Sequence, residues 1–205
     1  FVGGLSWKII GGVLAVAVPS VLVFLSIVMQ EGQTLIKDYQ RDRIMAFFDP
    51  ATYADTEAYQ QLNSVIAIGS GQLWGKGLNN TDIASVKNGN FLPESQTDFI
   101  FAVIGEELGF VGSAVVILLL ILIAMRCVSI ARVAKDTAGM VIAAGMGSLI
   151  GIQGFMNIAV ATMMMPNTGL PLPFVSYGLS SLVSMYIGIG FVLNVGLQRK
   201  NLYNL

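Results

Sequence analysis

Acidic side chains that could do chemistry gather in one short stretch of the sequence, Asn90–Phe110. It holds four of them: Glu94, Asp98, Glu106 and Glu107. The residues that follow, 108–125, carry no charge and are mostly apolar. Charge is costly in a membrane, so carboxylates at the mouth of a spanning helix usually serve a function. They can hold a divalent cation, abstract a proton or fix a cationic partner. We predict that Asp98 carries the function.

The overall composition predicts a membrane protein and limits the chemistry. Hydrophobic residues make up 55% of the chain, charged residues 11%, and the mean hydropathy is +0.74. The net charge of -1 gives no field that would attract nucleic acid. Cys127 is the single cysteine and there is no histidine, which excludes an internal disulfide, a Cys/His zinc site and a histidine-based triad. Carboxylates, Lys/Arg, hydroxyls, amides or a bound hard cation remain.

Apolar runs long enough to cross a bilayer predict four transmembrane helices, at about 9–29, 99–125, 138–165 and 177–197. Pro19 interrupts the first run, and none shows the alternation of barrel strands. We therefore predict an all-α polytopic membrane protein, a single membrane domain over 1–205. Residues 30–97 would form a long extracytoplasmic loop between the first two helices. The start, FVGGLSWK, lacks an initiator Met and a signal-peptide layout, so we expect the C-terminal part of a longer protein.

Basic residues predict the orientation of these helices. They lie beyond helix ends on one side: Lys8, Arg126, Arg132, Lys135, Arg199 and Lys200. By the positive-inside rule this side is the cytoplasm, so the C-terminus is cytoplasmic and residues 30–97 and 166–176 face outward.

Helical geometry gives Asp98 a place on the second helix. With Thr97 as the predicted N-cap, a turn of 100° per residue brings small residues within about 40° of Asp98. These are Ala102, Gly105, Gly109 and Gly112. Small residues mark close helix approach, so Asp98 should lie at the top of a buried seam. For Glu106 and Glu107 the alternative is a structural role, as helix-dipole partners or in salt bridges with Arg41, Arg43 or Lys76.

Two further segments of the sequence could line a site. Glycines at 69, 71, 75 and 77 suit tight turns and close approach of the backbone to a ligand, or a loop that bends back on the membrane. They match neither a Walker A loop nor a dinucleotide fingerprint. On the third helix, Gln153 and Asn157 lie four residues apart, and interhelical hydrogen bonding is favoured over substrate contact.

The stretch between the third and fourth helices predicts a rigid, non-helical passage at membrane depth. It contains Pro166, Pro171 and Pro173 and no charge. Proline removes a donor and breaks a helix, and irregular backbone is tolerated there only inside protein or beside a cavity. Hydroxyl groups follow that could reach a polar headgroup or pack in the core: Ser176, Tyr177, Ser180 and Ser181.

Four motifs, in order, resemble the SEDS family (shape, elongation, division and sporulation). They are YQRDRIMAFFDP, YQQLNSVIAIGSGQLWGKGL, FLPESQTDFIFAVIGEELGF and MPNTGLPLPFVSYGLSSL, within Tyr39–Leu197. The resemblance implies a multi-pass protein of the bacterial inner membrane that polymerises glycan from lipid II, with a class B penicillin-binding protein as partner. It also implies that Asp98 is the essential acid. Gln96 stands where many members have His, and Leu179 where a second Gly is usual.

Glycan polymerisation requires a sugar hydroxyl to lose its proton as it attacks C1, and a pyrophosphate leaving group to be stabilised. Asp98 could be the base or could hold a divalent cation, Mg²⁺ or Mn²⁺. Lys87 is a further cation of the outer segment that could clamp the pyrophosphate. The predicted substrate-binding residues are Arg41, Arg43, Lys76, Glu106, Ser176, Tyr177 and Ser180. We expect no haem, flavin, nucleotide or zinc.

Two other functions fit parts of the pattern. Broken helices, intramembrane amides and acids at a cavity mouth also occur in transporters, so a flippase for lipid-linked precursors is the alternative. A transporter should place an acid near the midplane, where this sequence has only Gln153 and Asn157. A structural scaffold is the third interpretation, and it would not need Asp98 on a buried seam. Membrane lipid is an expected partner, and nucleic acid is not.

Overall fold

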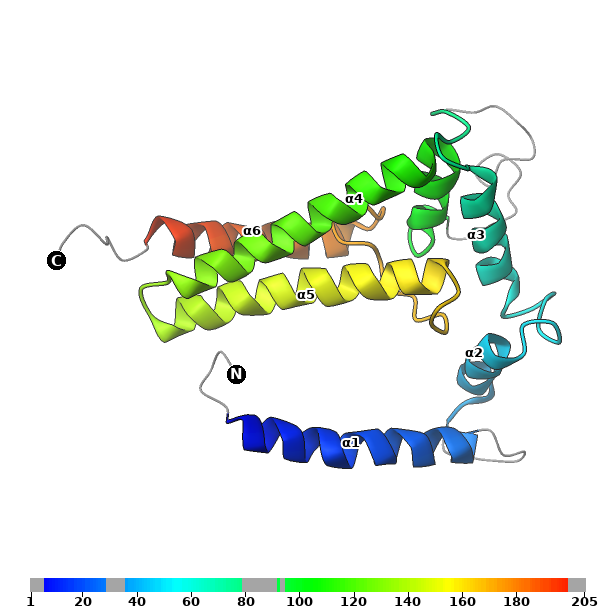
Figure 1. The fold of residues 1–205 in the computed structure, drawn as a ribbon, viewed down its shortest axis with the longest axis horizontal. Helices are drawn as coiled ribbons and strands as arrows, with labels where there is room; N and C mark the ends of the chain where they lie inside the picture. Colours follow the sequence, from blue (N-terminus) through cyan, green and yellow to red (C-terminus); the bar gives the residue numbers. More distant parts are fainter. Residues whose placement is uncertain (1–5, 29–35, 79–91, 93–94, 199–205) are drawn as a thin grey trace. The chain divides into compact units, whose positions relative to one another are not determined.

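The structure is a computed structural model that describes residues 6–28, 36–78, 92 and 95–198. Over these residues all regular structure is helical (Figure 1). The helices are α1 (Trp7–Val28), α2 (Asp38–Phe48), α3 (Tyr59–Ser70), α4 (Ile100–Arg132), α5 (Thr137–Ala161) and α6 (Leu179–Leu197). The chain divides into two compact units, residues 1–58 and 59–205.

Four of the described helices, α1, α4, α5 and α6, are long and apolar enough to cross a membrane, which confirms the predicted fold class. Two bounds differ from the prediction by more than two residues. Helix α4 continues to Arg132, so Arg126 and Cys127 lie within the helix. Helix α5 ends at Ala161 because Met163 takes a left-handed φ of 59°, which an α-helix cannot continue.

The first unit contains α1 and α2. The apolar side chains of α1 are exposed almost throughout, as in a helix that faces lipid or other transmembrane helices. Arg41 of α2 donates from Nε to the carbonyl of Val28, 3.3 Å away, and so joins α2 to the end of α1. Within the predicted loop 30–97, the described residues include two helices, α2 and α3.

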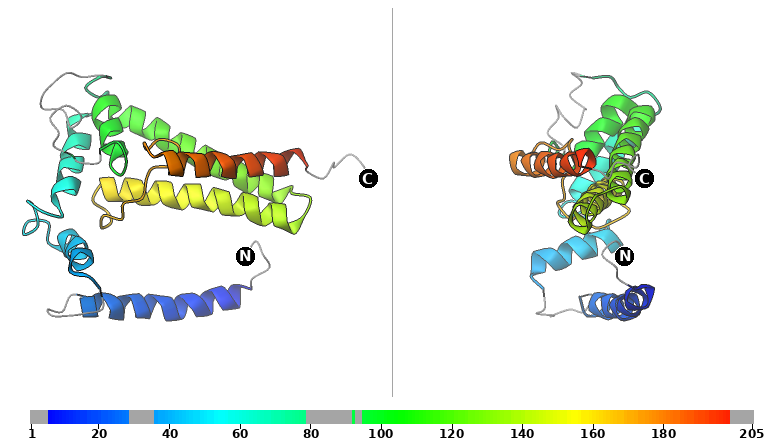
Figure 2. Two further views of the ribbon diagram at one scale, coloured as in Figure 1. Left: turned by 180° about the vertical axis from the view of Figure 1, so that it is seen from behind. Right: turned by 90° about the vertical axis from the view of Figure 1, so that its left-hand side faces the viewer.

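In the second unit, α4 and α5 run antiparallel side by side, α6 packs along them, and α3 lies across the end where α4 begins and α5 ends (Figures 1 and 2). Close contact of α4 with α5 requires a glycine, since a Cβ at Gly147 would lie 2.9 Å from the carbonyl oxygen of Ala124. Asp136 begins α5 as its N-cap, because its Oδ1 accepts from the N–H of Gly139 at 2.8 Å.

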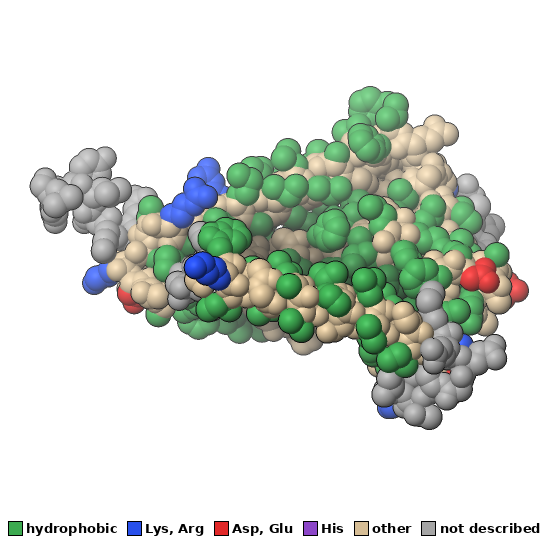
Figure 3. Space-filling model, turned by 60° about the horizontal axis from the view of Figure 1, so that its bottom comes forward, with side chains coloured by type: hydrophobic (Ala, Val, Ile, Leu, Met, Phe, Trp, Pro, Cys, Tyr) green, Lys and Arg blue, Asp and Glu red, His purple; other side chains and the backbone are tan. Residues whose placement is uncertain are grey.

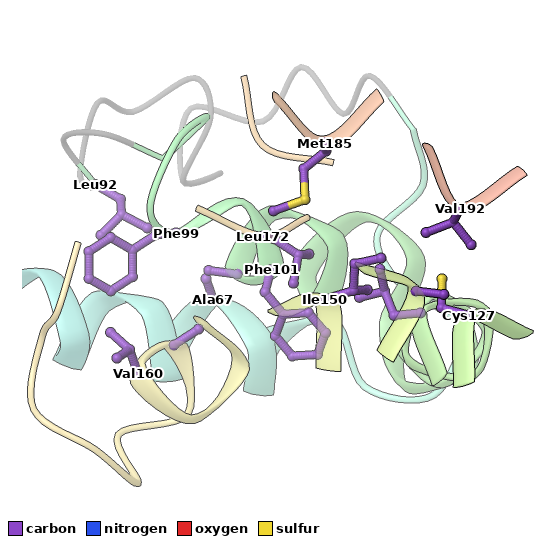
Figure 4. Close-up of a cluster of buried hydrophobic side chains, with 14 of the residues drawn as sticks. Ala67, Leu92, Phe99, Phe101, Cys127, Ile150, Val160, Leu172, Met185 and Val192 are labelled. Atoms are coloured by element: carbon purple, nitrogen blue, oxygen red, sulfur yellow. The ribbon is translucent and has the colours of Figure 1, made fainter. Parts of the chain in front are cut away.

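The apolar core of this unit lies between α4, α5 and the segments at the α3 end (Figure 4). Phe99, completely buried, lies beside Leu92, and Phe101 and Leu172 continue the cluster toward Ile150. Apolar side chains also cover the outer flanks of the helices, while charged side chains gather at the ends (Figure 3). This pattern is typical of spanning helices with charged ends in water.

Candidate active site

Asp98 lies outside α4, on the short segment that leads into it. The helix begins at Ile100, and its N-cap residue, Phe99, makes no side-chain capping bond. The prediction that Thr97 caps the helix was therefore wrong. The physical reason is that other elements bond the backbone of residues 96–98 and the ring of Phe99 is buried in the core. Asp98 itself is partly exposed.

Each of the carbonyl groups of residues 96–98 accepts a hydrogen bond from α5 or from the turn after it. In chain order the donors are the backbone N–H of Tyr177 at 2.8 Å, the hydroxyl of Ser176 at 2.5 Å and the side-chain amide of Asn157 at 2.7 Å. We call these donors the carbonyl clasp. Because consecutive peptide groups are held, the backbone of Asp98 has little freedom left.

The turn between α5 and α6, residues 162–178, is non-helical as predicted. Leu172 and Ser176 within it are each only 1% exposed, so its polar backbone must be bonded inside the protein. Gln153 donates to the carbonyl of Pro171 at 2.9 Å, and Asn157 donates to that of Leu170 at 2.7 Å. The two amides do hydrogen-bond between elements as predicted, with acceptors on irregular backbone instead of a second helix.

The carboxylate of Asp98 lies against this turn at Gly169. A Cβ placed on Gly169 would be 3.4 Å from Asp98 Oδ2, and the φ of Gly169 is +66°, a conformation that side chains rarely adopt. Asn167 supports the turn by accepting from the N–H of Gly169 at 3.1 Å. The sequence reasoning did not single out Gly169, although its Pro-Asn-Thr-Gly context is a turn signal.

A groove of 320 Å³ runs beside the segment that carries Asp98, between the start of α4 and the turn. Gln96, Glu107 and Tyr177 contribute its polar walls. The ring of Tyr177 is 75% exposed, while its N–H is bonded in the carbonyl clasp. An aromatic ring, an amide and a carboxylate are groups that can contact a sugar. Ser180 is exposed on the first turn of α6.

Lys76 and Glu106, both predicted to bind substrate, are paired with each other. Lys76 Nζ lies 2.8 Å from Glu106 Oε1, and the Glu106 side chain is only 2% exposed. A buried carboxylate needs such a partner, because an uncompensated charge is costly to bury. This is the structural alternative that the sequence left open for Glu106. A direct contact of either residue with substrate stays a prediction.

Residues 71–78, here called the glycine strap, pair with a break in α4 at Gly109, where φ is 66° and ψ -164°. Backbone bonds join strap and helix on both sides of the break: Lys76 N to Glu106 O, Gly77 N to Glu107 O, Phe110 N to Gln72 O and Val111 N to Leu73 O. The predicted close backbone approach of the glycines therefore exists, but their partner is the backbone of α4. The prediction that small residues form one continuous face of the helix past Gly109 was wrong, because the helix breaks at Gly109.

Other predicted site residues fall elsewhere. Arg41 and Arg43 belong to the first unit, where Arg41 bonds the end of α1 and Arg43 is exposed. Lys87 and Glu94 lie outside the described residues. Contact of Arg41, Arg43 and Lys87 with substrate stays a prediction.

The described residues could hold a divalent cation only together with the phosphate groups of a bound substrate. Among the described residues no group of three or more His, Cys, Asp or Glu side chains gathers as a ligand set. Mg²⁺ is often held by one or two carboxylates together with substrate phosphates and water. One carboxylate, Asp98, fits that arrangement, and it does not by itself make a metal cage.

These features define a polytopic helical membrane protein that holds the backbone of a partly exposed acid, Asp98, at one end of its bundle. Residues 1–201 match the model of the cell cycle protein family FtsW/RodA/SpoVE. The chain belongs to this family, which confirms the resemblance drawn from its four motifs.

Curated relatives cover nearly the whole chain. It is 42% identical to the peptidoglycan glycosyltransferase MrdB of Escherichia coli K12, over 98% of this chain and 52% of the relative. It is 38% identical to the probable peptidoglycan glycosyltransferase FtsW of Nitrosomonas europaea, over 98% of this chain and 49% of the relative. The chain thus spans about half the length of the curated relatives it matches.

The fold also matches a solved structure. A chain from a peptidoglycan synthase complex that coordinates polymerization and crosslinking superimposes with a TM-score of 0.69 at 28% identity. The match covers 97% of this chain and 51% of that one.

Proposed function

We propose that the full-length protein polymerises peptidoglycan glycan strands from lipid II at the outer face of the bacterial cytoplasmic membrane, for cell elongation, division or sporulation. Membership of the family and the names of two relatives, both peptidoglycan glycosyltransferases, support the reaction class. The observation that carries the proposal is Asp98: a partly exposed carboxylate whose own backbone is held by buried donors.

Asp98 would act on the acceptor sugar. A hydroxyl oxygen of the acceptor forms a bond to C1 of the donor sugar, and the bond from C1 to the lipid pyrophosphate breaks, with its electron pair leaving on the pyrophosphate. The hydroxyl proton passes to the Asp98 carboxylate, which makes the oxygen a better nucleophile as the bond forms. A carboxylate fixed by the carbonyl clasp would present its oxygen in one place, which lowers the entropy cost of the step.

The pyrophosphate leaving group needs positive charge beside it. Arg41, Arg43 and Lys87 are the cations that the sequence predicts for this role, and a divalent cation bound to the phosphates and Asp98 would supply the same stabilisation. Glu107 and Tyr177, on the groove beside Asp98, would contact sugar. The lipid tail would stay between the helices and the surrounding membrane.

The distribution of charge disfavours a flippase. Neither α5 nor α6 contains an Asp, Glu, Lys or Arg, and α4 has none between Leu108 and Met125. The polar groups in the interior of α5, Gln153 and Asn157, bond backbone carbonyls of the protein. A transporter needs an ionisable or solvated site near the midplane, reached from both sides.

A class B penicillin-binding protein would be the partner. The structural relative belongs to a peptidoglycan synthase complex that coordinates polymerization and crosslinking, which is consistent with such a partner. The test uses the full-length protein purified with that partner and supplied with labelled lipid II in detergent. Glycan chains longer than the substrate disaccharide are the expected product. A complex that is folded and intact yet leaves lipid II unpolymerised would contradict the proposed function.

The orientation of the helices can be tested by thiol labelling. Cys127 cannot report it, because it is buried within α4 at 1% exposure instead of lying beyond the helix as predicted. Ser85, an outward position in the predicted topology, lies outside the described residues. Thr168 and Lys135 are exposed at opposite ends of α5 and serve instead.

In intact spheroplasts, Thr168→Cys should react with an impermeant maleimide, and Lys135→Cys should react only after permeabilisation. This follows from the basic residues near Lys135, which should face the cytoplasm. The reverse labelling pattern would place Asp98 on the cytoplasmic side and contradict polymerisation at the outer face.

A further inference from the structure

Asn157 joins the two pieces of backbone that surround the Asp98 carboxylate. Its amide nitrogen donates both hydrogens, one to the carbonyl of Asp98 and one to that of Leu170, each at 2.7 Å. Leu170 directly follows Gly169, against which the carboxylate lies. One side chain therefore sets the distance between the segment that carries the acid and the turn that faces it.

The buried side chain of Asn157 combines two donor bonds with an acceptor that is left unsatisfied. The residue is 1% exposed, and its Oδ1 has no hydrogen-bond partner among the described residues. A buried acceptor left unsatisfied costs about 1–3 kcal/mol. Natural proteins tend to break such local rules at functional sites. Asn157 bears this cost, and its two donor bonds hold the carbonyls of Asp98 and Leu170 in place.

Gln153, one helical turn earlier on α5, is also a side-chain amide, but it does not bond the described segment that carries Asp98. Its amide donates to the carbonyl of Pro171 at 2.9 Å and so supports the turn. Gln153 makes no hydrogen bond to residues 96–98 among the described residues. The two amides thus form a matched pair: both hold the turn, and Asn157 also holds Asp98.

We propose that Asn157 is a positioning residue for Asp98. It acts through the Asp98 backbone: by holding the carbonyls of Asp98 and Leu170 together, it keeps the carboxylate at one place over Gly169. The inference rests on the proposed function, since it assigns Asn157 a part in the step that Asp98 would perform.

The kinetic test uses the full-length complex and Asn157→Leu, which keeps the branch at Cγ, enlarges the side chain and removes both donors. We expect kcat for polymerisation of lipid II to fall on the order of 100-fold, because a displacement of about 1 Å can cost that much. The KM for lipid II should change less than about threefold, since binding does not use this amide. Gln153→Ala should give a much smaller loss of kcat. Partner binding and a thermal unfolding curve show that each variant is folded.

A second arm separates positioning from general structural support. Asp98→Glu moves the carboxylate by one methylene, so the exact place of the backbone matters less for it. If Asn157 acts through Asp98, Asn157→Leu should cost much less in the Asp98→Glu background than in the wild type. An equal cost in both backgrounds would show a structural role and overturn the proposal.

Hydrogen exchange gives a readout that needs no activity. Peptides over residues 95–101 should exchange faster in Asn157→Leu than in Gln153→Ala, because one bond of the carbonyl clasp is gone. Unchanged exchange, or exchange that rises while kcat stays at the wild-type value, would overturn the inference. If the wild-type complex makes no glycan at all, the proposed function fails, and the exchange result alone decides whether Asn157 fixes the Asp98 segment.

Discussion

Asp98→Asn in the full-length protein should leave membrane levels and partner binding normal and reduce glycan polymerisation by orders of magnitude. The change keeps the size of the side chain and removes its charge, and neither a base nor a cation ligand keeps its function without that charge. A purely architectural Asp98 would lose on the order of 1 kcal/mol of stability or less, with polymerisation intact. The measurement is the length and amount of glycan made from labelled lipid II.

Glu107→Gln is the matched control for Asp98→Asn. Glu107 lines the groove beside the Asp98 segment, and its replacement removes the same charge, but Glu107 lies within α4 and not against Gly169. We expect a milder loss of polymerisation than for Asp98→Asn. Near wild-type polymerisation by Asp98→Asn would show that the acid is not catalytic.

The two roles open to Asp98 can be separated with a thiolate. Asp98→Cys should recover polymerisation with Cd²⁺ and not with Mg²⁺ if residue 98 ligates a cation, because thiolates prefer the softer ion. A base role predicts no recovery with either ion. Cys127 is present in both the wild type and the variant, and its burial keeps it out of the comparison.

Gly75→Ala should destabilise the protein strongly, because the glycine strap approaches the α4 backbone too closely for a Cβ. Gly75 has a φ of +79°, and a Cβ there would meet the carbonyl of Glu107 and lie 2.7 Å from the N–H nitrogen of Gly109. The positive φ costs about 1–2 kcal/mol in an alanine. The clash adds about 1–3 kcal/mol, since backbone atoms must move. Thermal unfolding of the full-length protein in detergent measures the loss.

Gly77→Ala is the control for the cost of the positive φ alone. Gly77 has a φ of +93°, but nothing lies within 4 Å of its Cβ position. Gly77→Ala should therefore lose only the conformational part. If the two variants unfold at the same temperature, the close approach of the strap to the α4 backbone does not contribute to the loss of stability.

Gly71→Ala and Gly69→Ala repeat this comparison without a positive φ, at the first residue of the glycine strap and near the end of α3. A Cβ at Gly71 would meet the carbonyl of Gly105, whereas Gly69 has nothing within 4 Å. Only Gly71→Ala should lower the unfolding temperature, because alanine is the better helix former at an open helical position.

Sequence patterns predicted the four spanning helices because each is a long apolar run. They also made Asp98 the candidate acid, because a charge at the edge of such a run is unusual, and its role stays a prediction. They failed at the start of α4. A helix extrapolated from Thr97 assumes that local propensity decides, but the carbonyl clasp and the buried ring of Phe99 hold residues 96–98 in another conformation. These bonds come from residues at least 59 positions away in the chain, which no local pattern reveals.

The break at Gly109 was hidden for a similar reason. Its glycine fits a seam of small residues equally well, and only the pairing of the glycine strap with α4 shows that the residue takes a positive φ. Likewise, the charges of Lys76 and Glu106 looked available for substrate until their separation of 2.8 Å placed them in one pair.

The break divides α4 into parts that different forces hold in place. Residues 100–111 are tied to the glycine strap by backbone bonds and by the Lys76–Glu106 pair, whereas residues 112–132 form the mostly apolar remainder of the helix, which packs against α5. The two parts can therefore be exchanged separately between relatives. A chimera could replace the helix from Gly112 onward and keep the surroundings of Asp98. A replacement of α5 would have to include residues 162–178, because the donors that hold the backbone of residues 96–98 come from both segments.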